Sequence, residues 1–264
     1  MIWLLAYAVG GLTAGFLAGL LGVGGGMTIV PIISAVLTAQ KVAPDHVIHI
    51  ALATAMCSIA FTSSATAFQH HKRGSVDWVM FRRLSPPMVA GTLLATACSS
   101  LIPQRLLAVA FALIVVVAGV QILVGKKPGP GKAPPGRAVI FAYGLAVGVI
   151  AGLVSAGGAF LTVPFMMYCG LPMMMAIGTG VVLAIPIAIM GSIGYIVSGW
   201  HVAGLPDYSL GFIYLPALAA IVCASVMVVP VGLRLAHRLP VQTLRRVFAY
   251  LLFLLAAKML YSYW

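Results

Sequence analysis

The chain has 264 residues, of which 62% are hydrophobic and only 7% are charged, whereas soluble domains carry about 25% charged residues. This composition excludes a soluble globular protein. Apolar runs of about 20 residues, the length that crosses a bilayer, recur along the chain. The sequence therefore predicts an all-α polytopic protein of the cell inner membrane.

The net charge of +12 raises the question of a nucleic-acid partner. Membrane proteins, however, collect Lys and Arg in their cytoplasmic loops. We therefore expect the lipid bilayer as the surroundings of this chain, and no nucleic acid as its partner.

The predicted elements form two similar series. The first series is a long apolar segment broken by glycines and then three ordinary spans, at residues 2–38, 45–70, 78–101 and 105–124. The second series has the same order, at residues 138–170, 173–199, 208–232 and 240–262. The stretch "GKKPGPGKAPPGR" between them reads as a polar linker. We divide the chain into a first transmembrane repeat, 1–124, a cytoplasmic linker, 125–137, and a second transmembrane repeat, 138–264.

Identities between the two series keep their order along the chain. An offset of 133 pairs the stretch "GLLGVGGGMTIVP", residues 19–31, with "GLVSAGGAFLTVP", residues 152–164. An offset of 125 then pairs Thr54 with Thr179, and an offset of 137 pairs Pro103 with Pro240. The drift in the offset is what loops of different length would produce, so we interpret the chain as an internal repeat.

The basic residues predict that the two repeats are inverted. Twelve of the 15 Lys and Arg residues fall within residues 72–83, 126–137 and 234–246, and the positive-inside rule makes all three regions cytoplasmic. The equivalent loops of the opposite repeat are poor in charge. Inversion needs an odd number of crossings per repeat, so we expect each glycine-broken segment to be a hairpin that enters and leaves on one side. The alternative is a single tilted and kinked helix.

The glycine-rich tips of these hairpins are the predicted binding site. Non-helical backbone is tolerated at membrane depth where it lines a cavity, and the helix that follows each tip presents free N–H groups that favour an anion. The chain has only three acidic residues, so we expect no metal site and no cofactor. The candidate residues at the tips are Gly24, Gly25, Gly26, Thr28, Ser155, Gly157 and Gly158.

Hydroxyl and imidazole side chains supply further candidates on the second segment of each series. Thr54 and Ser58 lie on one helical face, and Thr179 is the repeat partner of Thr54. The alternative for such hydroxyls is a bond back to the carbonyl group four residues earlier. His46 and His49 are candidates for proton coupling, and the alternative is that they are interfacial.

The stretches "GFLAGLLGVGGGMTIVPII" and "GVIAGLVSAGGAFLTVPF" resemble the sulfite exporter TauE/SafE family of membrane transporters, as do "ALATAMCSIAFTSS" and "LPVQTLRRVFAYLL". The resemblance implies transport of sulfur-containing anions such as sulfite or sulfoacetate. It also implies a binding role for the tip glycines and for Thr54 and Thr179. The second tip departs from the family pattern, because Ser155, Ala156 and Ala159 replace a fuller glycine run.

These observations lead to one function and two alternatives. We expect a transporter, and specifically an exporter, of small sulfur-containing anions that is not an enzyme. The first alternative is an anion channel or a facilitator for another small oxyanion or a carboxylate. The second, a membrane enzyme, would need a nucleophile, metal or haem arrangement that the sequence does not offer. A homodimer is left open.

Overall fold

The computed structural model describes residues 2–21, 25–124, 135–236 and 241–263. Gly24 and most of the predicted linker lie outside the described residues. The first series of elements comprises α1 (Ile2–Leu21), α2 (Gly26–Gln40), α3 (Val47–Lys72), α4 (Trp78–Ala97), the short 3₁₀ helix η1 (Ser99–Leu101) and α5 (Gln104–Val124). The second comprises α6 (Arg137–Val154), α7 (Ala159–Tyr168), α8 (Met173–Gly199), β1 (Ser209–Leu210), β2 (Ile213–Tyr214), α9 (Leu215–Ala236) and α10 (Val241–Tyr263).

Long apolar helices confirm a helical, multi-pass membrane protein. Five of the described helices are long and apolar enough to cross a bilayer, namely α3, α5, α6, α8 and α9. Helix α4 has a suitable length, but Arg82 and Arg83 near its start make it less apolar. Within their apolar windows α3 is 78% buried and α9 only 28%, so α3 is a central helix and α9 a peripheral one.

Each glycine-broken segment is two helices packed antiparallel. Gly10 of α1 lies against Ile32 of α2, and Ala14 of α1 lies against Gly25, which precedes α2. The two helices therefore run in opposite directions. In the second series the Tyr143 hydroxyl donates to the carbonyl oxygen of Leu161 at 2.8 Å, while Val147 lies near Gly158. Both segments are therefore hairpins of helices rather than single kinked helices.

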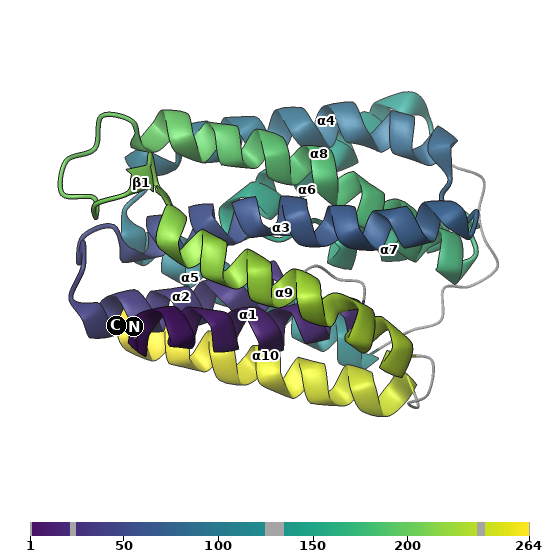
Figure 1. Ribbon diagram of the computed structural model, residues 1–264. Coiled ribbons are helices and arrows are strands. Elements are labelled where there is room, and N and C mark those ends of the chain that lie inside the picture. The colour runs from purple at the N-terminus through teal and green to yellow at the C-terminus, as the bar shows by residue number, and fades with distance from the viewer. Residues whose placement is uncertain (1, 22–24, 125–134, 237–240, 264) are drawn as a thin grey trace.

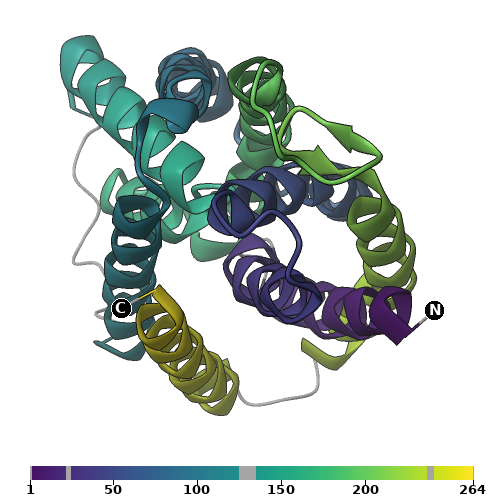
Figure 2. The ribbon, with the colours of Figure 1, turned by 90° about the vertical axis from the view of Figure 1, so that its left-hand side faces the viewer.

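The bundle is held together by pairs of helices that join the two series. Helix α1 packs along α9, α4 along α6, α3 along α8 and α5 along α10. Figure 1 shows both chain termini and β1 at one end of the bundle, which we call the terminal end, and the C-terminal ends of α3 and α9 at the other. Figure 2 looks onto the terminal end, where the α8–α9 connection crosses the helix ends.

The structure corrects the bounds of two predicted spans. The span predicted at 208–232 begins only at Leu215, because residues 209–214 form the antiparallel hairpin β1–β2. Tyr208 and Gly211 have φ angles of +62° and +55°, which a right-handed helix cannot contain. The span predicted at 78–101 likewise ends as an α-helix at Ala97, before η1.

Candidate functional site

The tips of the two hairpins touch each other. Gly26, the first residue of α2, lies so close to Ser155 that a Cβ atom at position 26 would collide with the carbonyl oxygen of Ser155. The same Cβ would stand 2.6 Å from Cδ1 of Ile59 on α3. Only glycine permits this approach. We call the contact between Gly26 and Ser155, together with the adjoining tip residues 25 and 156–158, the tip junction.

The second tip turns through two residues in the left-handed region. Helix α6 ends at Val154, and the next residue, Ser155, has a φ of +48°. The Ser155 N–H donates to Gly152 and the Ala156 N–H to Ala151, at 3.4 and 3.1 Å, which is the Schellman pattern of helix termination. Gly158, with φ +72°, then leads into α7. Ser155 thus stands where helices usually place glycine, and it brings a hydroxyl group to the junction.

Two helices begin at the tip junction without side-chain caps. The N-cap residues of α2 and α7 are Gly25 and Gly158, and neither supplies a side chain to the first-turn N–H groups. The Ser155 hydroxyl is fully buried and makes no hydrogen bond of good geometry, although the Tyr195 hydroxyl lies close enough to interact with it. A buried polar group without a partner costs free energy. Unsatisfied donors and the positive ends of two helix dipoles are therefore gathered at one buried place.

The other hydroxyl groups near the tips bond to their own helices. Thr28 Oγ1 donates to the carbonyl oxygen of Gly25 at 2.8 Å, and Ser58 Oγ donates to that of Ala55 at 2.7 Å. Both side chains are buried. Their hydroxyl hydrogens are used locally, and only their lone pairs remain for other donors.

Thr54 and Thr179 hold equivalent connections of the opposite series. The backbone N–H of Tyr214, just before α9, donates to Thr54 Oγ1 at 3.0 Å. The backbone N–H of Asp77, just before α4, donates to Thr179 Oγ1 at 2.9 Å. Thr54 of the first series therefore fixes the start of α9 in the second, and Thr179 of the second series fixes the start of α4 in the first.

The structure does not bring these two threonines together. Helices α3 and α8 are antiparallel, because Met56 lies against Gly191 and His70 against Gly178. Measured from Ile59, which lies at the tip junction, Thr54 is five residues or about 7.5 Å along α3 toward the terminal end. Thr179 is displaced along α8 toward the opposite end. The tip residues converge, whereas Thr54 and Thr179 flank them on opposite sides.

His46 and His49 lie together at the terminal end of α3. His49 Nε2 donates to the carbonyl oxygens of Ser99 and Ile102, at 3.1 Å each, and its ring stacks on Phe212 at 5.0 Å. The ring of His46 is 5.8 Å from that of His49. The Nδ1 atoms of both rings are buried and unpartnered. Within the described part of the chain, no three His, Cys, Asp or Glu side chains cluster as metal ligands would.

Three residues at or beside the junction were not among the site residues predicted from the sequence. Ile59 reaches both tips, and the Ala184 side chain would be 2.6 Å from a Cβ at Gly157. The Tyr195 hydroxyl donates to the carbonyl oxygen of Gly152 at 2.9 Å and ties α8 to the end of α6. Apolar residues within apolar helices look alike in sequence. Only the offset of 125, which pairs residue 59 with residue 184, could have marked two of them.

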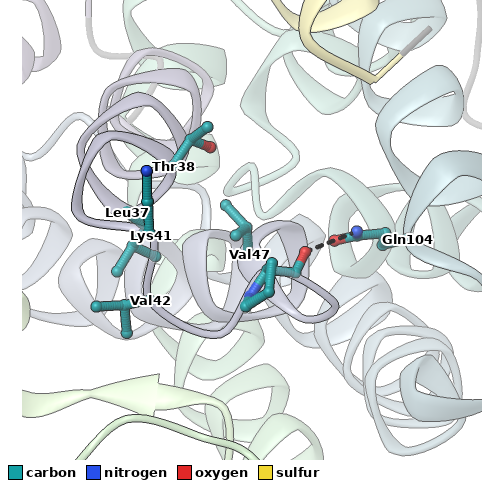
Figure 3. A pocket seen from close by; sticks show the side chains of 7 residues that line it. Leu37, Thr38, Lys41, Val42, Val47 and Gln104 are labelled. Carbon is teal, nitrogen blue, oxygen red and sulfur yellow. Dashed lines mark hydrogen bonds between the residues drawn. The ribbon is translucent and has the colours of Figure 1, made fainter.

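A separate cavity of about 450 Å³ opens at the terminal end. Figure 3 shows Val47 between the side chains of α2 and Gln104 of α5, whose Nε2 donates to the carbonyl oxygen of Pro44 at 2.9 Å. Among the lining residues that the structure describes, Lys41 alone is charged. The lining comprises Leu37, Thr38, Lys41, Val42, Pro44, Val47 and Gln104.

Comparisons with known proteins agree with this architecture. The chain is 33% identical over 259 residues to a "Probable membrane transporter protein" of Haemophilus influenzae, which covers 97% of each chain. It is 26% identical over 194 residues to the "Probable membrane transporter protein YdhB" of Bacillus subtilis, covering 70% of this chain and 76% of the relative. The sequence model of the family described as "Sulfite exporter TauE/SafE" matches residues 7–259. The chain therefore belongs to the TauE/SafE family of membrane transporters.

Proposed function

We propose that this protein exports a small sulfur-containing anion, such as sulfite or an organosulfonate like sulfoacetate, and binds it at the tip junction. The observation that carries the proposal is the meeting of two uncapped helix N-termini beside the fully buried hydroxyl of Ser155, which makes no hydrogen bond of good geometry. The anion takes hydrogen bonds from first-turn N–H groups and from Ser155. Helix dipoles supply the positive potential that Lys or Arg would supply elsewhere.

The binding residues in this proposal differ in how directly they contact the anion. Gly25, Gly26, Gly157 and Gly158 give the anion access to the backbone, with Gly24 beside them in the sequence, and Ser155 donates directly. The lone pairs of Thr28 and Ser58 take part in the surrounding network. Thr54 and Thr179 act on either side of the junction, along the route by which the anion enters and leaves.

We infer that the two series are inverted repeats and that the terminal end faces outward. Support comes from the antiparallel hairpins, from the cross-series helix pairs and from Lys72 and Arg73, which lie at the end opposite the termini. In this orientation the protein crosses the cell inner membrane with its linker in the cytoplasm. An inside-negative potential then favours export of an anion by about 2.3 kcal/mol per charge and 100 mV.

Proton coupling is proposed for His46 and His49. Each has a buried Nδ1 atom without a partner, and both lie beside the connection that carries Phe212. In proteoliposomes, an imposed pH gradient is expected to change the flux of wild-type protein and to have no effect on His46→Gln/His49→Gln. A pH response that survives in the double variant would remove these histidines from the mechanism.

The decisive experiment is flux in proteoliposomes against a panel of sulfite, sulfoacetate, thiosulfate, acetate and neutral sulfones. We expect saturable, electrogenic transport of at least one sulfur-containing anion and no transport of sulfones. Saturable transport of acetate alone would favour a carboxylate facilitator. Unitary current steps in planar bilayers would favour a channel. Absence of flux for every anion would contradict the proposal.

A further inference from the structure

Ile59 is an apolar side chain that contacts both tips of the junction. It is fully buried and comes from the central helix α3. Its Cδ1 atom would stand 2.6 Å from a Cβ at Gly26, and its Cγ2 atom 3.7 Å from a Cβ at Gly157. One side chain therefore contacts the first tip and the second tip together, in the place where the proposed anion binds.

Helix α8 contacts the junction through a smaller side chain. The offset of 125 that pairs Thr54 with Thr179 also pairs Ile59 with Ala184. The Ala184 side chain would lie 2.6 Å from a Cβ at Gly157, so α8 approaches the second tip with a single methyl group. Among the described residues of these two central helices, Ile59 of α3 is the branched side chain that contacts both tips, whereas α8 contributes Ala184 to the second tip.

We propose that Ile59 sets the upper size of the anion that the tip junction accepts, an inference that rests on the proposed function. A β-branched side chain in a helix is held in one dominant χ1 rotamer, so Ile59 is a rigid wall rather than an adaptable one. It offers no hydrogen bond and therefore does not bind the charged group. It limits the length of the organic substituent that accompanies that group.

The test is a series of alkanesulfonates, from methanesulfonate to butanesulfonate, as competitors of sulfite binding to purified protein. Wild-type protein is expected to lose affinity sharply at one chain length. Ile59→Ala moves that limit to a longer chain, with ~10-fold or more gain for the longest sulfonate relative to methanesulfonate, because one methylene group in a pocket changes selectivity on that scale. Ala184→Val moves the limit to a shorter chain.

Ile50→Ala is the matched control. Ile50 is also fully buried on α3 but does not reach the tips, so this variant makes a comparable cavity and leaves the limit where it was. Ile59→Val removes only Cδ1, the atom nearest Gly26, and serves if Ile59→Ala does not fold. A shifted limit in the Ile59 variants and not in Ile50→Ala supports the inference.

Two results overturn it in different ways. If wild-type protein binds sulfite and the Ile59 variants keep the wild-type size limit, Ile59 does not determine selectivity, while the proposed function stands. If wild-type protein binds neither sulfite nor any sulfonate, the proposed function fails and the inference fails with it.

Discussion

The two hairpin tips share a sequence pattern but need glycine for different physical reasons. In the first tip, Gly25 has φ −66° and ψ 1°, a conformation open to most residues. Its constraint is space, because the carbonyl oxygen of Ala14 lies 3.0 Å from the position of a Cβ. In the second tip, Ser155 and Gly158 have positive φ angles. The nearest obstacle at Gly158 is only the end of the Met88 side chain, at 2.9 Å.

One repeated motif therefore shows two reasons for glycine, which are close packing at Gly25 in the first tip and backbone conformation at Gly158 in the second. The first tip fits its neighbours without room for a methyl group, while the second makes its turn with left-handed residues. Substitutions at the first tip should therefore act on the junction through collisions. Substitutions at Ser155 and Gly158 of the second tip should act through conformational strain or through loss of the Ser155 hydroxyl, whereas Gly157 is limited by space, because the Ala184 side chain lies 2.6 Å from a Cβ there.

The largest effect is expected for Gly26→Ala. The added methyl group collides with backbone of Ser155 as well as with Ile59, so the two tips must separate. We expect sulfite flux to fall at least ~100-fold, since small misplacements of binding groups have effects of this order. Gly136→Ala is the control, because nothing lies within 4 Å of a Cβ at that position. Wild-type flux in Gly26→Ala would show that the tip contact is not needed.

Next comes removal of the Ser155 hydroxyl. Losing a hydrogen bond to a charged group costs about 1.5–3 kcal/mol, or about 10- to 150-fold in affinity. We expect this loss in both Ser155→Ala and Ser155→Gly, measured by sulfite binding at fixed ionic strength. Ser155→Gly should also unfold at a higher temperature than Ser155→Ala, because glycine relieves the left-handed conformation. Unchanged affinity in both variants would remove the hydroxyl from the site.

The threonine pair tests whether the two series are equivalent. Thr54→Val and Thr179→Val each leave a backbone N–H without its acceptor, which should lower the free energy of unfolding by about 1–3 kcal/mol. We expect similar losses in the two variants, with Thr→Ser controls close to wild type. Sulfite affinity should change less than in Ser155→Ala. A tenfold loss of affinity in Thr54→Val at unchanged stability would instead place that hydroxyl on the anion.

Gly158 tests the conformational half of the comparison. Gly158 has a φ of +72°, so Gly158→Val should lower the free energy of unfolding by about 1–2 kcal/mol, which is the cost of placing a side chain in the left-handed region. Gly158→Asn should lose less, because asparagine visits that region readily. Thermal unfolding in detergent measures both. Equal losses in the two variants would show that space, as in the first tip, is the true constraint.

The smallest effect is expected for Lys41→Gln, away from both tips. An exposed charge contributes about 1 kcal/mol at 4 Å in water, so affinity for sulfite on the terminal side should fall by no more than ~5-fold. The effect should vanish at high salt. Lys258→Gln, on the exposed surface of α10, is the control. A larger, salt-independent loss in Lys41→Gln would move the binding site to the cavity of Figure 3.

Glycine, proline and apolar length were enough to predict most of the fold. Helix α6 ends at Val154 and α7 begins at Ala159, on either side of the second glycine tip, and α2 begins at Gly26 in the first; α8 has the predicted bounds, Met173–Gly199. The hairpin β1–β2 escaped prediction because "SLGFIYLP" is as apolar as the helix that follows. Its turn, Gly211–Phe212, uses a positive φ at Gly211, and a single glycine in an apolar run does not distinguish a turn from a helix.

The candidate site was predictable from the sequence only at its glycine-rich tips. The tips could be located because helix breaks in an apolar chain are conspicuous. The partner of Thr54 could not, since it is a backbone N–H 160 residues away, and every residue type except proline offers one. Ile59 was missed because an isoleucine in a buried helix has the same appearance whether it fills the core or faces a ligand.

The central claim is that the anion binds at the tip junction, and anomalous diffraction from crystals grown with selenite tests it most directly. Selenite replaces sulfite with a heavier atom whose position can be located without ambiguity. The account predicts a selenium peak between the tips, placed so that the selenite oxygens accept hydrogen bonds from the Gly26 and Met27 N–H groups and from the Ser155 hydroxyl, and its loss in Ser155→Gly. A peak beside Lys41, with none between the tips, would contradict the account.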